Sequence, residues 1–435
     1  MQYIDNILFV AILGAGIWFF AKNIKSLVRN IKLGKDIDRS DNKPERWKNM
    51  AKIALGQGKM VRRPVSGLLH IVVYVGFILI NIEVLEIVID GIFGTHRIFS
   101  QVLPDSVYGF LIGNFEVLAF LVLVSVIVFW IRRNVIKIQR FWKDEMKGWP
   151  KSDGNMILYF EMILMTLFLV MNATDVHFQA MNTGNVISQF IEPLFSGLED
   201  GTLHLIERGA WWLHIVGILI FLNYLYYSKH LHILLAFPNT FFANLKPKGQ
   251  FTNDANVTKE VLMMMDPDAD PYAMPEEGAE EEVSTFGAKD VTDLSWVNLL
   301  NAYTCTECGR CTSECPANLT GKKLSPRKVM MDTRDRLEEV GKNIDANNGE
   351  FKDDGKNLFD WITKEEIWAC TSCNACVETC PVNIDPLSII MDMRRYLVME
   401  ESAAPTELNN MMQNVENNGA PWPYNQMDRL KWVDE

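Results

Sequence analysis

Eight cysteines are the residues of this sequence whose spacing points most directly to chemistry. All of them lie after residue 300, in two copies of the pattern CxxCxxCxxxCP that begin 65 positions apart. Cys305, Cys308, Cys311 and Cys315 form the first copy, which ends in Pro316; Cys370, Cys373, Cys376 and Cys380 form the second, which ends in Pro381. In this pattern three thiolates of one copy hold one [4Fe-4S] cluster, while the fourth cysteine reaches the other cluster.

We therefore predict two [4Fe-4S] clusters with crossed ligands. One is held by Cys305, Cys308, Cys311 and Cys380, and the other by Cys370, Cys373, Cys376 and Cys315. A pair of zinc ribbons is the alternative, because CxxC pairs are common zinc ligands. Zinc knuckles use only two cysteines each, however, and they do not need the third cysteine or the CP.

The seven histidines, all within the first 235 residues, suggest a further redox centre. His214 and His232 are 18 positions apart. Eighteen residues are five whole turns, so we expect both to project from one face of the fifth helix, about 27 Å apart along the axis, which suits two haems stacked across a bilayer. His230 would point away from that face, and we expect it to make an interfacial contact instead.

Ionisable residues inside apolar segments are costly in lipid and are functional candidates by default. His70 is one of them, and Glu83 and Glu86 are others. Quinone chemistry moves protons together with electrons, and carboxylates can transfer those protons. We therefore take Glu83 and Glu86 as candidates for proton transfer to a quinone, with polar helix-packing contacts as the structural alternative.

Five apolar runs of membrane-spanning length must position these side chains. They are Ile7–Ala21, Val65–Ile89, Tyr108–Ile131, Met156–Val176 and Ala210–Tyr227. The connections at residues 22–63 and 132–151 are rich in Lys and Arg, whereas the other two are not. Positive loops stay in the cytoplasm, which predicts an external N-terminus, retained as an anchor helix, and a cytoplasmic cysteine domain. All eight cysteines belong to the two motifs and none is left for a disulfide bond, which agrees with a reducing compartment for this part of the chain.

The rest of the chain divides by composition. We predict a mainly α-helical fold: a five-helix transmembrane bundle with haem b at residues 1–235, an acidic linker at 236–290, a ferredoxin-like domain at 291–402 and a tail at 403–435. The net charge of −12 and the lack of a basic face in the C-terminal half argue against nucleic-acid binding. The sequence has no GxGxxG motif after a strand and no Walker motif, so it predicts no nucleotide or flavin site.

The cysteine region resembles the iron-sulfur subunits of heterodisulfide-reductase-related membrane complexes. The resemblance rests on FGAKDVTDLSWVNLLNAYTCTECGRCTSECPANLTGKKLSPRKVMMDTRDR and IWACTSCNACVETCPVNIDPLSIIMDMRRYL. It implies that the soluble substrate is converted by a partner: a CCG-domain or heterodisulfide-reductase-like catalytic subunit, an electron-transferring flavoprotein, or a dehydrogenase of a small hydroxy acid. The segment Pro421–Trp432 resembles the docking ends of that family.

The segment WWLHIVGILIFLNYLYYSKHLHI resembles the last span of nitrate reductase gamma-type cytochromes b. That resemblance implies haem ligation by His214 and His232. The family's other two ligands lie ten residues apart on the second span, where this chain has His70 and then Ile80. The resemblance thus implies one haem b held by His70 and His232. An outer haem would need another partner for His214: His177, or else His96 or His204.

Together these features predict a multi-pass subunit of the cytoplasmic membrane that passes electrons between a cytoplasmic partner and the quinone pool. A haem-free anchor that recruits a soluble redox complex is the main alternative. A transporter is a third reading, but it predicts inverted repeats among the spans, and the sequence has none.

Overall fold

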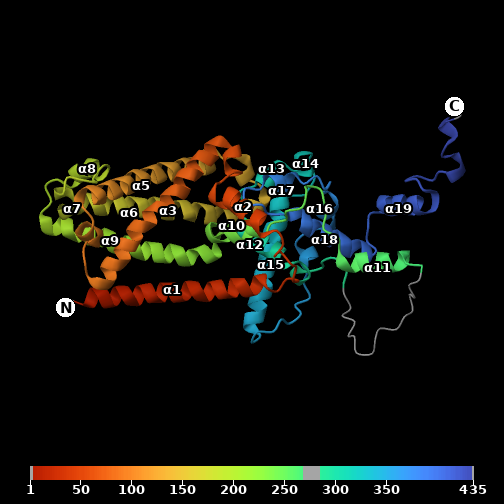
Figure 1. Cartoon of the computed structure of the whole chain (residues 1–435), viewed down its shortest axis with the longest axis horizontal. Coiled ribbons are helices and arrows are strands. Elements are labelled where there is room, and N and C mark those ends of the chain that lie inside the picture. Colours follow the sequence, from red (N-terminus) through yellow and green to blue (C-terminus); the bar gives the residue numbers. More distant parts are fainter. Residues whose placement is uncertain (1–2, 268–284, 434–435) are drawn as a thin grey trace.

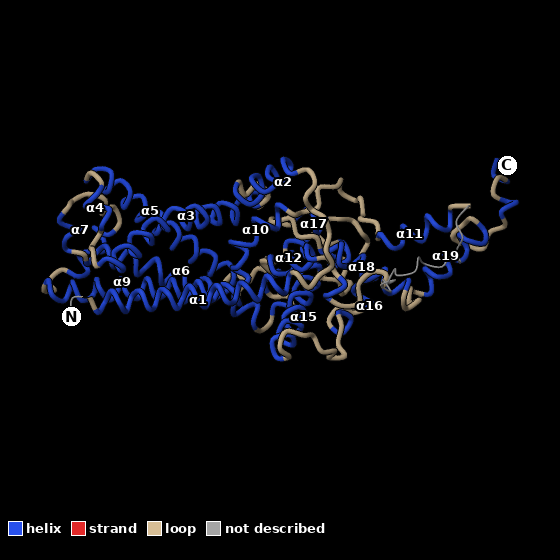
Figure 2. The backbone as a smooth tube through the Cα atoms, turned by 60° about the horizontal axis from the view of Figure 1, so that its bottom comes forward, coloured by secondary structure: helices blue, strands red, loops and turns tan. Residues whose placement is uncertain are grey.

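The computed structural model describes residues 3–267 and 285–433, which are helical with no strand (Figure 2). Five helices in these ranges are long and apolar enough to cross a membrane, which confirms the predicted spans. They are α1 (Ile4–Ile31), α3 (Pro64–Phe93), α5 (Asp105–Asn134), α6 (Trp149–Thr174) and α9 (Asp200–Tyr224). The predicted mainly α fold is therefore confirmed.

The helices α1, α5, α6 and α9 run roughly along the longest axis of the molecule, and α3 crosses them obliquely; the N-terminus lies at one end of this bundle and the cysteine domain at the other (Figure 1). α6 packs between α5 and α9, α3 packs on α5, and α1 lies against α3 and α9. We call the end beside the cysteine domain the junction end, and the opposite end the far end. Three short helices cover the far end: α4 (Ile98–Val102), α7 (Val176–Ala180) and α8 (Ser188–Ile191).

The cysteine domain repeats one local design. In each half a capped helix precedes the cysteine motif, and a helix with a capping side chain and a proline in its first turn follows it. The helices before the motifs are α12 (Trp296–Thr304) and α16 (Lys364–Trp368); those after them are α15 (Pro326–Ala346) and α18 (Pro386–Met399). Within the motifs lie α13 (Arg310–Ser313), α14 (Pro316–Leu319) and α17 (Ala375–Thr379). The first position of a helix has no intrahelical partner for its backbone N–H, so proline, which lacks that N–H, can begin α14, α15 and α18 at low cost.

The two halves of the chain share one hydrophobic core at the junction end. Leu27, Phe221 and Leu225 of the membrane half belong to the same buried cluster as Leu299 and Ile344 of the cysteine domain. The helices α2 (Lys43–Met50) and α10 (His232–Phe241) pack beside each other there, and α10 also packs on α12. The domain is thus docked on the bundle through a buried core.

The predicted linker boundary at residue 236 needs correction, because α10 runs through it and is part of the junction. A further helix, α11 (Ala255–Met265), lies within the supposed linker. Residues 268–284, which hold most of its acidic run, lie outside the described residues. Beyond the domain, α11 and the tail helix α19 (Thr406–Asn418) extend away from the bundle (Figures 1 and 2).

Candidate functional site

The eight cysteine sulfurs are free thiols grouped around two cavities. The first cavity is lined by Cys305, Cys308, Cys311 and Cys380, together with Cys376. The second is lined by Cys315, Cys370, Cys373 and Cys376. Each cavity therefore gathers three cysteines of one motif and the CP cysteine of the other, and Cys376 borders both. Four thiols around one small cavity are a donor set that fits a [4Fe-4S] cluster.

Both motifs turn their sulfurs inward with the same backbone device. Glu307 and Gly309 have positive φ angles of 51° and 71°, and the equivalent Ser372 and Asn374 have 57° and 60°. Two left-handed residues per motif bend the chain around a single point. At Gly309 the requirement is also steric, because a Cβ there would lie 2.5 Å from Nη1 of Arg327.

The buried cysteines are unfavourable places for a thiolate without a compensating cation. Burial raises the pKa of Cys305 to about 12 and that of Cys380 to about 11. Iron binding must therefore displace protons from these thiols, and the charge of the metal stabilises the resulting thiolates. The backbone N–H of Ile384 donates to Sγ of Cys380 at 3.3 Å, and that of Ser372 to Cys370 at 3.4 Å.

The two cavities differ in their surroundings. Each cavity has two buried ligand cysteines, but Cys373 of the second cavity is exposed to solvent, whereas the less buried cysteines of the first, Cys308 and Cys311, are only partly exposed. The first motif also touches the membrane half: Nη1 of Arg310 donates to the carbonyl of Lys59 at 3.2 Å. The first cavity thus faces the bundle, and the second reaches the protein surface.

Three histidines meet at the junction end, beside the first cavity. The rings of His70 and His232 lie 6.4 Å apart, with an angle of 38° between their planes. Two imidazoles that bind one iron from opposite sides, at metal–nitrogen distances of about 2 Å, place their ring centres roughly 6 Å apart. Nδ1 of His232 lies 3.0 Å from the carbonyl of Lys229, and Nδ1 of His70 is buried without a hydrogen-bond partner in the described part of the chain. This pair fits a bis-histidine haem.

The prediction that one continuous helix carries His214 and His232 was wrong. α9 ends at Tyr224, and short 3-10 turns separated by the extended Ser228 follow before His232 begins α10. Asp153 stabilises this break, because it accepts hydrogen bonds from the Tyr224 hydroxyl at 2.6 Å and from the Lys229 N–H at 3.1 Å. The two histidines therefore do not share a helix.

The break also changes the position of His230. We expected an interfacial contact on another face, but its ring packs 5.5 Å from that of His232 and 5.4 Å from that of Phe221. His230 thus lies inside the junction, close to the proposed ligands.

No histidine joins His214 to make a second pair in the described part of the chain. Its side chain is 1% exposed, its Nδ1 lies 3.0 Å from the carbonyl of Leu164, and its ring packs on Phe168. The candidate partner His177 instead packs its ring against His96, at 6.2 Å. His214 therefore has no histidine partner among the described residues. His96 and His177 lie as close together as His70 and His232 do, but Nε2 of His96 is engaged by Asp175 at 3.1 Å.

The carboxylates Glu83 and Glu86 lie towards the far end, roughly 20 Å along α3 from His70. Both are 2% exposed. Glu86 is engaged, because it accepts a hydrogen bond from the N–H of Phe99 at 2.7 Å and lies 3.5 Å from the Tyr108 hydroxyl. Oε2 of Glu83 is buried without a partner among the described residues. Glu83 is therefore the freer of the two to bind a proton.

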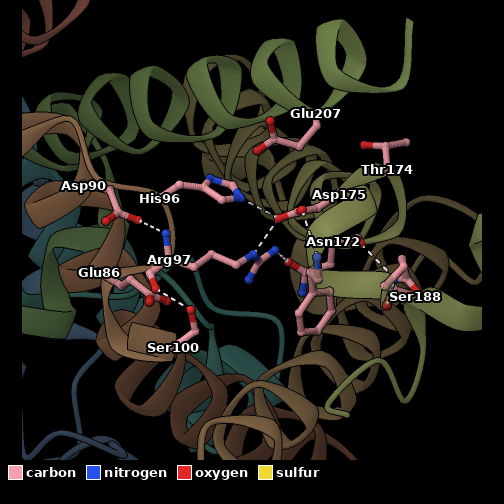
Figure 3. Close-up of polar contacts among 12 residues, drawn as sticks. Glu86, Asp90, His96, Arg97, Ser100, Asn172, Thr174, Asp175, Ser188 and Glu207 are labelled. Carbon is pink, nitrogen blue, oxygen red and sulfur yellow. Dashed lines mark hydrogen bonds and ion pairs between the residues drawn. The ribbon is translucent and has the colours of Figure 1, made fainter. Parts of the chain in front are cut away.

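An arginine that the sequence analysis did not single out organises the far end. Arg97 donates to Asp175 at 2.6 Å, to Asn172 at 2.8 Å and to Tyr108 at 3.1 Å, and its backbone N–H donates to Asp90 (Figure 3). We call this set the far-end network. Arg97 lies in a loop that is otherwise poor in Lys and Arg, and this isolated basic residue is the sequence signal that could have pointed to the network.

His96, Asp175 and Glu207 also gather at the far end, with potential ligand atoms within 4.8 Å of one another. Asp175 is paired with Arg97 and with Nε2 of His96 at 3.1 Å, and Glu207 is paired with Arg208. Hydrogen bonds and ion pairs thus account for these groups without a metal ion.

Comparison with known proteins identifies the cysteine domain. Residues 304–384 match a 4Fe-4S dicluster domain. Along 99% of its length the chain is 28% identical to the probable iron-sulfur-binding oxidoreductase FadF of Bacillus subtilis. It is 26% identical, over 92% of its length, to the EtfAB:quinone oxidoreductase of Syntrophomonas wolfei. The chain spans only 61% and 55% of these two relatives.

A shorter similarity links the chain to the heterodisulfide reductases. Over 107 residues, 24% of its length, it is 29% identical to one of the subunits of a CoB-CoM heterodisulfide reductase of Methanosarcina acetivorans, and 52% of that relative is covered. No solved structure matches the chain. Its homologues are thus iron-sulfur oxidoreductases and heterodisulfide reductase subunits, as the cysteine motifs led us to expect, and its five apolar helices indicate a membrane protein.

Proposed function

We propose that this chain carries electrons between a soluble partner and a membrane quinone, using two [4Fe-4S] clusters and one haem b. One observation carries the proposal: the first cysteine motif contacts both segments that bear the paired histidines. Glu307 pairs with Lys229, three residues before His232, and Arg310 bonds to Lys59 just before α3. The first motif therefore lies against the segments that lead to both candidate haem ligands, which supports electron transfer from the cysteine domain into the bundle.

The proposed ligand sets follow the two cavities and the histidine pair. Cys305, Cys308, Cys311 and Cys380 would hold the cluster nearer the membrane half, which we call the near cluster. Cys315, Cys370, Cys373 and Cys376 would hold the distal cluster, and His70 with His232 the haem. These groups would supply one-electron redox chemistry. The carbonyl of Lys229 would keep the proton of His232 on Nδ1, which leaves Nε2 for iron.

The partner would approach from the side of the exposed Cys373. The similarity to an EtfAB:quinone oxidoreductase favours an electron-transferring flavoprotein, and that to a heterodisulfide reductase favours a catalytic subunit of that kind. The tail provides a further contact surface, because Trp422, Met427 and Trp432 are 59%, 88% and 73% exposed. Large exposed apolar side chains of this sort mark protein–protein contacts.

On the membrane side, we propose that Glu83 transfers protons to or from the quinone. Its free oxygen supports this role over Glu86, whose carboxylate is already hydrogen bonded. The basic loops lie at the junction end, so the positive-inside rule favours a cytoplasmic iron-sulfur domain in the cytoplasmic membrane and an external N-terminus.

The test is spectroscopic and uses the full chain purified in detergent. The dithionite-reduced minus oxidised spectrum should contain the α band of a b-type haem, and electron paramagnetic resonance (EPR) should detect two reduced [4Fe-4S] clusters. A quinol analogue should then reduce the haem, or its quinone should oxidise it. Two clusters without the α band would replace the proposal with the haem-free anchor.

A further inference from the structure

The cavity of the near cluster is surrounded by cations that have no acidic partner. Arg310 is 4% exposed and interacts electrostatically with the sulfurs of Cys308 and Cys380. Lys59 interacts in the same way with Cys380, and Arg140 with Cys308. In the described part of the chain, none of these three cations lies within ion-pair distance of a carboxylate. Glu378 interacts with Lys59 at longer range, but it is paired with Arg62 and Lys248.

Two of these cations come from the membrane half. Lys59 lies just before α3, and its ammonium group donates to the carbonyl of Val377 at 3.4 Å. Arg140 lies in the loop after α5, its Cβ is within 3.4 Å of the Cβ position at Gly309, and its Nε is buried without a partner among the described residues. The docked bundle therefore brings positive charge to the cysteine domain.

Other charged groups near this cavity are largely balanced. Arg327 lines the cavity but pairs with Glu145 at 2.6 Å. Glu307 also lines it, and it is paired with Lys229 and, at 2.8 Å, with Arg334. The unbalanced charge at the near cavity is therefore positive.

The cavity of the distal cluster has no such excess. None of the described residues that line it is charged. Of the two nearest charged groups, Arg394 interacts with Cys370 and Asp385 with Cys376, so that one cation and one anion oppose each other. Backbone N–H groups contact sulfurs at both cavities: those of Glu307, Val382 and Ile384 at the near one, and those of Ser372 and Val377 at the distal one. Both cavities thus receive such contacts, whereas only the near one has an excess of unpaired cations.

A [4Fe-4S] cluster with four thiolates gains negative charge when it is reduced, so nearby cations favour the reduced state and raise the reduction potential. We propose that Lys59, Arg140 and Arg310 hold the potential of the near cluster above that of the distal cluster, which directs electrons from the exposed Cys373 towards the membrane. This inference rests on the proposed function. Each electron would leave a reduced cofactor of the partner and pass by the distal cluster, the near cluster and the haem to the membrane quinone, which would take up two electrons and two protons to become the quinol.

The solvent exposure of Cys373 acts in the opposite direction, because water also stabilises the more charged reduced cluster. The fixed charges are buried or half-buried and are screened less than surface charges. Variants of these cations therefore test the proposal more sharply than the two native potentials alone.

The experiment is an EPR-monitored redox titration of the full chain in detergent. The two signals are assigned by the loss of one in Cys308→Ser and of the other in Cys373→Ser. In the unmodified chain the near cluster should be reduced at the higher potential. Lys59→Met and Arg140→Met should each shift that potential downward, and the double variant further, while the distal signal shifts less.

Two controls separate charge from folding. Arg140→Lys keeps the charge and should keep the potential, and Arg394→Met should lower the distal potential only. A near cluster with the lower native potential, or one that does not respond to either membrane-half variant, would overturn the inference. Absence of either cluster signal, or of the haem band, would instead refute the proposed function from which the inference proceeds.

Discussion

The junction end and the far end of the membrane half both hold buried polar side chains, but they use them differently. At the far end Arg97 donates to both Asp175 and Asn172, and Oε2 of Glu83 is the exception there, since it has no partner in the described part of the chain. At the junction end Nδ1 of His70 and Nε of Arg140 have no partner among the described residues. Buried polar groups that satisfy each other stabilise a fold, whereas those left unsatisfied are candidates for binding a ligand or a charge. This contrast supports our proposal that the haem is bound at the junction end.

The largest expected effect concerns the histidines of the two ends. His70→Ala or His232→Ala should abolish the haem α band, because each removes one of the two proposed axial ligands. His177→Ala and His96→Ala, which change the far end, should keep the full band. The measurement is the reduced minus oxidised spectrum at equal protein concentration. A band lost in His177→Ala and kept in His232→Ala would reverse our assignment of the two ends.

The far-end network should be the more important for stability. Arg97→Met would leave the Asp175 carboxylate without its guanidinium partner in a buried site, at a cost of roughly 3–5 kcal/mol. Thermal unfolding in detergent micelles measures the loss, and the haem spectrum below the transition should not change. Arg63→Met is the control, because its partner Glu314 is 52% exposed and water can hydrate that carboxylate when the arginine is removed. Equal costs for the two variants would contradict the special role of Arg97.

An intermediate effect is expected at the junction. Gly309→Ala combines a positive φ with a clash against Arg327, which is fully buried and donates to the Arg140 carbonyl at 2.6 Å. We expect a loss of about 2–3 kcal/mol in unfolding free energy. Gly321→Ala has φ of +85° but open space around it, and should cost only about 1–2 kcal/mol. A Gly309→Ala cost no larger than that of Gly321→Ala would show that Arg327 yields easily.

The smallest effect should come from an exposed ion pair at the junction. Hydrogen bonds from Lys248 and Arg62 lower the pKa of Glu378 to about 2. A carboxyl group with a depressed folded-state pKa stabilises the fold above its unfolded pKa of about 4.3, and this contribution is lost as the pH falls from there towards 2.

Glu378→Gln should therefore cost roughly 0.5–1 kcal/mol at pH 7, since the pair is partly solvated. The difference in unfolding free energy between the variant and the unmodified chain should narrow below about pH 4. A difference that stays constant down to pH 3 would mean that the Glu378 charge does not stabilise the docked domain.

The sequence alone was sufficient to predict the grouping of the cluster ligands and the number of membrane spans. Cluster ligands are encoded by local spacing, so Cys305 to Cys315 and Cys370 to Cys380 could be grouped without a structure. The spans follow from apolar runs long enough to cross a bilayer, which is also a local property. These features need no knowledge of which segments meet.

Local spacing failed where a distant contact overrides it. The five-turn relation between His214 and His232 assumed an unbroken helix, and Asp153, about 70 positions earlier in the chain, stabilises the break by its hydrogen bonds to Tyr224 and Lys229. His70 and His232 still meet, because both lie where their segments reach the junction end. The depth of each histidine was readable from the sequence, but its helical face was not.

Tertiary structure alone decided how the two halves communicate. An acidic linker predicted a tethered domain, yet a shared core and the contacts of Lys59, Arg140 and Lys229 dock the domain on the bundle. Lysines and arginines in cytoplasmic loops are expected in any membrane protein, so nothing in their local sequence separates those beside a cluster from those in solvent. The cysteines determined by themselves that the chain can hold two clusters; only the packing of the membrane half against them decided which one lies beside the paired histidines and the unpaired positive charges.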